Sequence, residues 1–207
     1  SVAISDDGTM CAAGTVGAKV LIFATSDNSE VASYHTKSGV NAVTFCGSGD
    51  LCSLVVGTLS GVVISYYSNT PLANGEAIPR DHRPPPELQF GNKQLVHCMA
   101  QADGGSRLAV GGHGGLVTVY SVELLRGRAC VLHELTRFDA IGDVQGMAMN
   151  HDASILVTGG DQKIVQIWRM KETANIASTT RMTGYVINSF SCKAQIHSLS
   201  LTADGTR

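Results

Sequence analysis

Glycine-rich turns alternate with short apolar runs along this chain, and the alternation repeats. Four segments begin on a glycine, end nine positions later on an aromatic residue, and align without gaps. They are GTVGAKVLIF (14–23), GTLSGVVISY (57–66), GGHGGLVTVY (111–120) and GGDQKIVQIW (159–168). Short runs rich in β-branched residues and bounded by glycine are typical of strands. Each segment therefore predicts a turn followed by a β-strand.

A second turn precedes each of three aligned segments. Gly8, Gly105 and Ala153 stand six residues before the glycines that open the first, third and fourth segments, and apolar alternation such as VQGMAMN (144–150) precedes them. In the second unit this turn, GSGDL (47–51), is two residues longer. Each unit is thus predicted to begin strand, turn, strand, turn, strand.

The opening glycines of the four segments recur at spacings of 43, 54 and 48 residues. A repeat of about 40–50 residues with about four short strands is typical of a β-propeller blade. We therefore predict an all-β protein, a β-propeller of four-stranded antiparallel blades. The predicted repeat units are 1–39, 40–95, 96–143, 144–195 and a partial unit, 196–207.

The fourth unit resembles the WD-repeat family of propellers. LVTGGDQKIVQIW (156–168) is similar to that family's run from the second strand, through a turn, to the tryptophan that ends the third strand. In the family an Asp, a His, a Ser or Thr and this Trp form a tetrad in each blade. Here Asp161 lies one residue early, and Arg169 follows the tryptophan where the family has an aspartate. The turn-aspartate position is held by Gly17, Ser60, Gly114 and Gln162.

The two ends of the chain match the same part of the repeat, VAISDDGT (2–9) and LSLTADGT (199–206). Because WD-repeat propellers mostly close with about seven blades, we predict that these four units belong to a larger propeller. Missing blades or a partner chain would then complete it. A closed four-bladed ring is the alternative.

Composition narrows the function classes. The chain is 43% hydrophobic and 15% charged, which favours a well-packed globular protein. Its net charge of −2 gives no electrostatic footprint for nucleic acid. No apolar stretch approaches the 18 residues expected of a membrane span, so direct membrane insertion is not expected.

The six cysteines are scattered through apolar contexts without a CxxC pair, which predicts buried reduced thiols and no structural metal. The chain also lacks an Asn-x-Ser/Thr acceptor for glycans. These features predict a cytoplasmic location, with the cytosolic face of a membrane as an alternative.

A proline-rich insertion is the strongest candidate for a binding element. All five prolines lie between Pro71 and Pro86, within a predicted insertion loop at 69–95. Proline blocks helix and central strand, and a rigid scaffold often presents its binding residues on such loops. An ordinary long connection between two blades is the alternative. The predicted protein-binding residues are Arg80, Asp81, His82, Arg83, Pro84, Pro85 and Pro86.

No catalytic motif emerges, and we predict no enzyme activity, no cofactor and no metal. GGHGG (111–115) lies in a predicted turn between strands rather than before a helix, so it fits neither phosphate-binding fingerprint. The seven histidines show no metal-binding spacing. His97 and His197 hold equivalent places in their units and are predicted to be packed, while His113 could line a blade surface.

These observations predict a non-catalytic protein–protein interaction scaffold or adaptor. A narrower resemblance supplies one alternative: residues 143–207 look like the late blades of the WD-repeat region that ends BEACH-domain proteins, which work in membrane traffic. An enzyme with a site in the propeller channel is a second alternative. A phosphoinositide or nucleic-acid binder is a third, disfavoured by the sparse basic residues.

Overall fold

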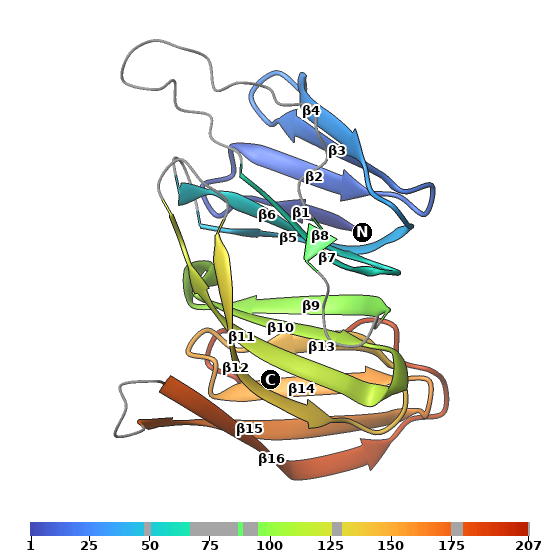
Figure 1. The fold of residues 1–207 in the computed structure, drawn as a ribbon. Coiled ribbons are helices and arrows are strands. Elements are labelled where there is room, and N and C mark those ends of the chain that lie inside the picture. The colour runs from blue at the N-terminus through green and yellow to red at the C-terminus, as the bar shows by residue number, and fades with distance from the viewer. Residues whose placement is uncertain (48–50, 67–86, 89–94, 126–129, 175–179, 207) are drawn as a thin grey trace. The chain divides into compact units, whose positions relative to one another are not determined.

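The computed structural model describes residues 1–47, 51–66, 87–88, 95–125, 130–174 and 180–206. The described residues form four four-stranded sheets, and in each sheet the strands lie in chain order, as Figure 1 shows. The all-β architecture of four-stranded antiparallel sheets is thereby confirmed. The chain divides into two compact units: Ser1–Val96 with Glu123–Val131, and His97–Val122 with Leu132–Arg207.

The first unit contains two sheets built from consecutive hairpins. Its first sheet comprises β1 (Val2–Ile4), β2 (Met10–Gly14), β3 (Lys19–Ala24) and β4 (Glu30–His35). Its second comprises β5 (Val40–Cys46), β6 (Ser53–Thr58), β7 (Gly61–Tyr66) and β8 (Glu87–Leu88). Every residue of β6 is buried, which explains why its middle, residues 54–56, is an apolar run rather than an alternation. The core includes Met10, Val20, Ile22, Phe45 and Leu54.

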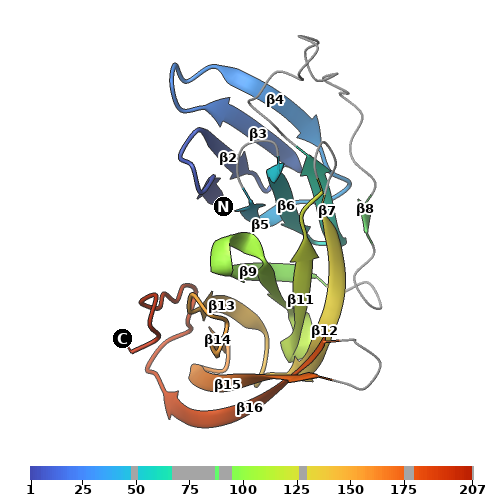
Figure 2. The same ribbon diagram turned by 90° about the vertical axis from the view of Figure 1, so that its left-hand side faces the viewer.

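The second unit repeats this plan, and Figure 2 shows it from a second side. One sheet comprises β9 (Val96–Ala102), β10 (Arg107–Gly112), β11 (Leu116–Glu123) and β12 (Val131–Asp139). The other comprises β13 (Val144–Met149), β14 (Ile155–Gly160), β15 (Ile164–Ala174) and β16 (Thr180–Ser191). Two single-turn 3₁₀ segments, η2 (Asp103–Gly105) and η3 (His113–Gly115), flank β10.

The turns predicted from the repeat occupy the left-handed backbone region. The φ angles are +68° at Gly8, +85° at Gly105, +58° at Ala153 and +69° at Gly205. Glycine adopts this region without steric cost, whereas a side chain is disfavoured there. The repeat therefore needs a left-handed residue at this point, and Ala153 meets the need at some energetic cost.

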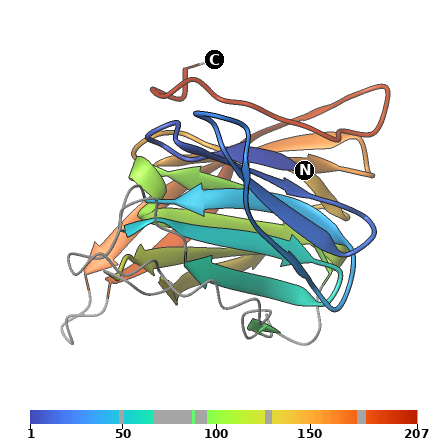
Figure 3. The same cartoon turned by 90° about the horizontal axis from the view of Figure 1, so that it is seen from above.

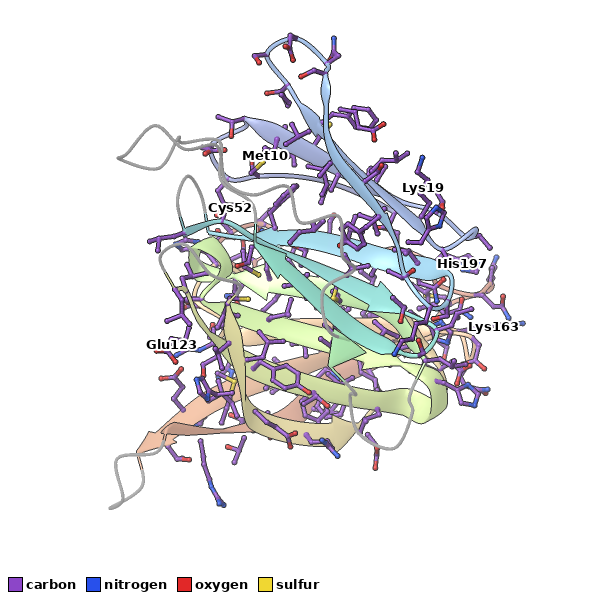
Figure 4. The ribbon with its side chains drawn as sticks, turned by 45° about the horizontal axis from the view of Figure 1, so that its top comes forward. Met10, Lys19, Cys52, Glu123, Lys163 and His197 are labelled. Carbon is purple, nitrogen blue, oxygen red and sulfur yellow. The ribbon has the colours of Figure 1, made fainter. Side chains whose placement is uncertain are left out.

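Lys163, in the turn between β14 and β15, is another non-glycine residue with positive φ, at +61°. Its side chain is exposed (Figure 4), so it contributes little packing. Lys163→Gly is expected to stabilise the protein by about 0.5–1 kcal/mol, because the left-handed strain is relieved. Thermal unfolding would measure the gain. Lys163→Ala is the control: it removes the same charge but keeps the Cβ, so an equal gain from it would refute the explanation.

The glycines that open the four aligned segments share a second property. A Cβ placed on Gly14 would lie 2.2 Å from Val40 Cγ1, and a Cβ on Gly57 would lie 2.4 Å from Val96 Cγ1. The equivalent contacts are 3.0 Å for Gly111 with Val144 Cγ1 and 3.0 Å for Gly159 with Ile196 Cγ2. In every pair both residues belong to the same compact unit.

The partner in the first three pairs is the residue that opens a following strand, β5, β9 or β13. Ile196 takes the same place although residues 192–206 contain no strand (Figure 3). The backbone hydrogen bonds also show that Ile196 is equivalent to Val40. Val40 N donates to Thr15 O at 3.0 Å, and Ile196 N donates to Gly160 O at 3.1 Å. The repeated glycine therefore marks a close contact, which we call the blade seam.

The aromatic residues that end the aligned segments are packed where the structure describes them. Trp168 is 5% exposed and Tyr120 is 6% exposed, while Phe23 is half-buried. Trp168 Nε1 donates to Thr158 Oγ1 at 2.9 Å, so a buried hydrogen bond joins β14 and β15. The side chain of Tyr66 lies outside the described residues.

All six cysteines are reduced thiols, as predicted. Cys46, Cys52 and Cys130 are buried, whereas Cys11, Cys98 and Cys192 are half-buried, so complete burial was wrong for those three. Burial raises the pKa of Cys52 to about 12 and that of Cys98 to about 12. Both thiols are therefore protonated and unreactive near neutral pH.

Candidate functional site

The residues predicted to bind protein, 80–86, lie outside the described part of the chain, and their role remains a prediction. The strands on either side do place the segment. β7 ends at Tyr66, and β8 pairs with it through Val62 with Leu88 and Val63 with Glu87. The proline-rich segment therefore joins the third and fourth strands of one sheet, not two successive blades. Glu87 and Leu88, predicted as loop within 69–95, instead form the fourth strand.

A different cluster appears in the second unit. Among the described residues, His97, His113 and Asp143 bring three metal-ligating side chains together. His97 is the second residue of β9, His113 opens η3, and Asp143 directly precedes β13. The cluster therefore joins residues of two neighbouring sheets.

The aspartate holds the cluster together. His113 Nδ1 lies 3.0 Å from Asp143 Oδ2, and His97 Nε2 lies 4.0 Å from the same oxygen. The other carboxylate oxygen, Oδ1, accepts a hydrogen bond from Gly114 N at 2.7 Å. Asp143 N in turn donates to Asp161 Oδ1 at 2.8 Å. Both the backbone and the carboxylate of Asp143 are thus anchored.

Glycines explain how the histidine turn approaches the aspartate. Gly115 has a φ of +83°, and a Cβ there would lie 2.3 Å from the carbonyl oxygen of Ala140. Gly115 O also accepts a hydrogen bond from Ala140 N at 2.8 Å. GGHGG is therefore a turn between strands, as predicted, and its glycines allow His113 to reach the segment before β13.

The charge on Asp143 is favoured by its surroundings. The hydrogen bond from Gly114 N, together with His113 and His97, lowers the pKa of the carboxyl from its usual 3.8. A carboxyl whose folded pKa is lowered adds stability above its unfolded pKa, and the addition disappears as the pH falls through the folded value. The side chain is 27% exposed, so solvent screening reduces the effect.

The resulting prediction concerns stability against pH. The native chain should be more stable than Asp143→Asn at pH 7, and the difference should shrink as the pH falls below about 3.8, the usual carboxyl value. Urea unfolding of both proteins between pH 7 and pH 2.5 measures this. A difference that stays constant through the acid range would contradict the lowered pKa.

The histidines match their predictions only in part. His97 is half-buried beside Asp143, but His197 is exposed, as Figure 4 shows, so its predicted packing was wrong. His113 is 64% exposed and lines the surface, as one alternative allowed. Sequence reasoning missed the cluster because its members lie 16 and 30 residues apart, with no local motif to join them.

Comparison with known proteins supports the fold. No family model matches the chain. The β-propeller domain of Cps50 (Swd1) from Myceliophteria thermophila superposes with a TM-score of 0.66 at 10% identity, over 92% of this chain and 57% of that one. NET1-associated nuclear protein 1 of Saccharomyces cerevisiae is 30% identical over 97 residues, or 47% of this chain. The chain spans about a tenth of that relative's length. The fold is a β-propeller of four-stranded antiparallel sheets.

Proposed function

We propose that this chain is part of a non-catalytic protein-interaction scaffold built on a WD-repeat propeller. The observation that carries the proposal is the repeated architecture: four similar sheets, with a long proline-rich connection between the third and fourth strands of one of them. A rigid sheet that presents such a connection suits recognition of another protein. The likeness to the Cps50 (Swd1) propeller and the Trp168–Thr158 hydrogen bond support the WD-type part of the proposal.

The partner is proposed to be a protein rather than nucleic acid or a membrane. The net charge of −2 disfavours a phosphate backbone. No helix among the described residues is long and apolar enough to cross a membrane. The partially matching yeast protein is nuclear by name, which supports a nuclear location as an alternative to the cytoplasmic one. Neither similar protein supports the resemblance to BEACH-domain proteins of membrane traffic.

An enzyme with a site in the propeller channel remains the second candidate function. The observation in its favour is the cluster of His97, His113 and Asp143, since these residue types serve in both acid–base and metal chemistry. His113, however, is largely exposed, whereas catalytic groups usually act in a site shielded from water. The scaffold is therefore the favoured function.

Affinity capture on the purified chain tests the scaffold. Proteins retained from cell extract would be identified by mass spectrometry, and each candidate purified and titrated against the chain. The test variant replaces residues 71–86 with a Gly/Ser linker. The matched control replaces 175–179, which joins the third and fourth strands of the fourth sheet. Circular dichroism would verify folding of both.

The scaffold proposal predicts a purified partner that binds the native chain and the 175–179 variant equally but binds the 71–86 variant at least tenfold more weakly. Equal binding to all three would exclude the proline-rich segment and transfer recognition to the sheets. Absence of any partner that binds in purified form would contradict the scaffold itself.

A further inference from the structure

We propose that His97, His113 and Asp143 bind a divalent transition-metal ion, with zinc as the favoured occupant. The inference is independent of the scaffold function, because it rests on the geometry of one cluster in the second unit. It also differs from the sequence prediction, which expected no metal.

The donor set selects the ion. Two imidazole nitrogens and one carboxylate oxygen are typical zinc ligands, and three protein ligands leave a fourth position for water or a partner's side chain. Magnesium and calcium prefer several oxygen ligands, whereas this cluster offers one carboxylate and two nitrogens. Cu²⁺ also suits imidazole, so it serves as a competitor in the test.

The distances between the three ligand atoms fit a zinc ion after a modest change in side-chain position. All three ligand atoms lie within 4.8 Å of one another. Tetrahedral zinc, with bonds of about 2.0–2.2 Å, needs neighbouring ligand atoms about 3.4 Å apart. The His113–Asp143 separation of 3.0 Å is already close to this value, and the His97–Asp143 separation of 4.0 Å must shorten slightly. His97 is half-buried at a strand start, so a small rotation of its ring supplies the change.

Hydrogen bonds from neighbouring groups orient the Asp143 carboxylate, as such hydrogen bonds commonly orient the ligands of protein metal sites. Gly114 N donates a hydrogen bond to Oδ1 of Asp143, and Oδ2 therefore remains available to face both histidines. Without metal, a proton on His113 Nδ1 can form the hydrogen bond to Oδ2. Zinc binding would displace that proton and use the freed nitrogen, because an imidazole binds metal through its unprotonated nitrogen.

The position of the cluster between two sheets implies that bound zinc would stabilise the fold. His97 and His113 come from the sheet of β9 to β12, while Asp143 leads into β13 of the next sheet. A bound ion would link these two sheets within the second unit. Because it binds the folded chain and not the unfolded one, zinc should raise the unfolding temperature, and the rise should continue as the free zinc concentration increases beyond Kd.

The test titrates zinc chloride into the chelator-treated chain by calorimetry. The variants are His113→Ala, whose side chain is mostly exposed, and Asp143→Asn, which keeps an oxygen to accept the Gly114 hydrogen bond. His151→Ala is the matched control, since His151 is exposed and lies outside the cluster. A Cu²⁺ titration of the same proteins compares the competitor ion. Circular dichroism establishes that each variant is folded.

We expect one zinc ion per chain, at least tenfold weaker binding in His113→Ala and in Asp143→Asn, and unchanged binding in His151→Ala. Cobalt substitution distinguishes this site from the free cysteines, because a nitrogen and oxygen site gives no thiolate-to-metal charge-transfer band. Undetectable zinc binding, or binding equal in all four folded proteins, would overturn the proposal. A thiolate band would also overturn it, by assigning the ion to cysteine.

Discussion

Trp168→Ala is expected to lower the free energy of unfolding by about 3–5 kcal/mol. Trp168 is 5% exposed, and its ring centroid lies 4.3 Å from that of Phe138. Truncation removes a large apolar surface from the core of the second unit and leaves a cavity that the surrounding sheets fill only in part. Urea denaturation followed by circular dichroism measures the loss. A loss below about 1 kcal/mol would show that Trp168 does not hold the fourth sheet together.

The hydrogen bond of Trp168 can be separated from its packing. Thr158→Val keeps a side chain of similar shape but removes the oxygen that accepts from Trp168 Nε1. Because the buried N–H is then unpaired, we expect a loss of about 1–3 kcal/mol, smaller than that of Trp168→Ala. Equal losses in the two variants would assign the whole effect to the hydrogen bond rather than to burial.

Gly14→Ala is the second large effect, with an expected loss of about 2–3 kcal/mol. The added Cβ would lie 2.2 Å from Val40 Cγ1 and 3.0 Å from Val43 Cγ1. Val40 is 2% exposed, so its short, branched side chain has little room to move. The two strands at the seam, β2 and β5, must separate, or strain must persist. Denaturant titration measures the loss.

Gly17→Ala is the matched control for that substitution. Gly17 is exposed in the turn that follows, and a Cβ there would come no closer than 3.8 Å to another atom, Thr15 Oγ1. A change within about 0.5 kcal/mol is expected. If both alanines cost the same, the loss at Gly14 would reflect the general effect of replacing glycine, not a clash at the seam.

The repeat pattern was sufficient to predict the turns and the first three strands of each sheet, because the left-handed turn residues and the strand periodicity are local properties. The positions of Gly8, Gly105 and Ala153 were found in this way, and their positive φ angles agree. The reason for Gly14 and its equivalents was not visible in the same pattern. Their requirement comes from Val40 and its equivalents in the following sequence repeat, and such contacts carry no local signature.

The metal-ligating cluster shows even more clearly that contacts between distant residues leave no signal in the local sequence pattern. The two histidines each had an ordinary explanation in their own sequence repeat, His97 as a packed strand residue and His113 as a turn residue, and Asp143 was not singled out. Only the close approach of the η3 turn to the segment before β13, through Gly115 and Ala140, brings His113 to Asp143. Similarly, Glu87 and Leu88 pair with β7 across the proline-rich segment, and proline content alone could not reveal that strand.

The central claim is that each repeated glycine marks a close contact with the residue that follows in the next repeat, the blade seam. A double-mutant cycle of Gly14 and Val40 tests this claim most directly. Val40→Ala removes the methyl groups that a Cβ at Gly14 would meet. If the seam is real, Gly14→Ala should cost about 2–3 kcal/mol in the native chain but less than about 1 kcal/mol beside Val40→Ala, a coupling of at least about 1 kcal/mol. An identical cost of Gly14→Ala in both backgrounds would contradict the claim.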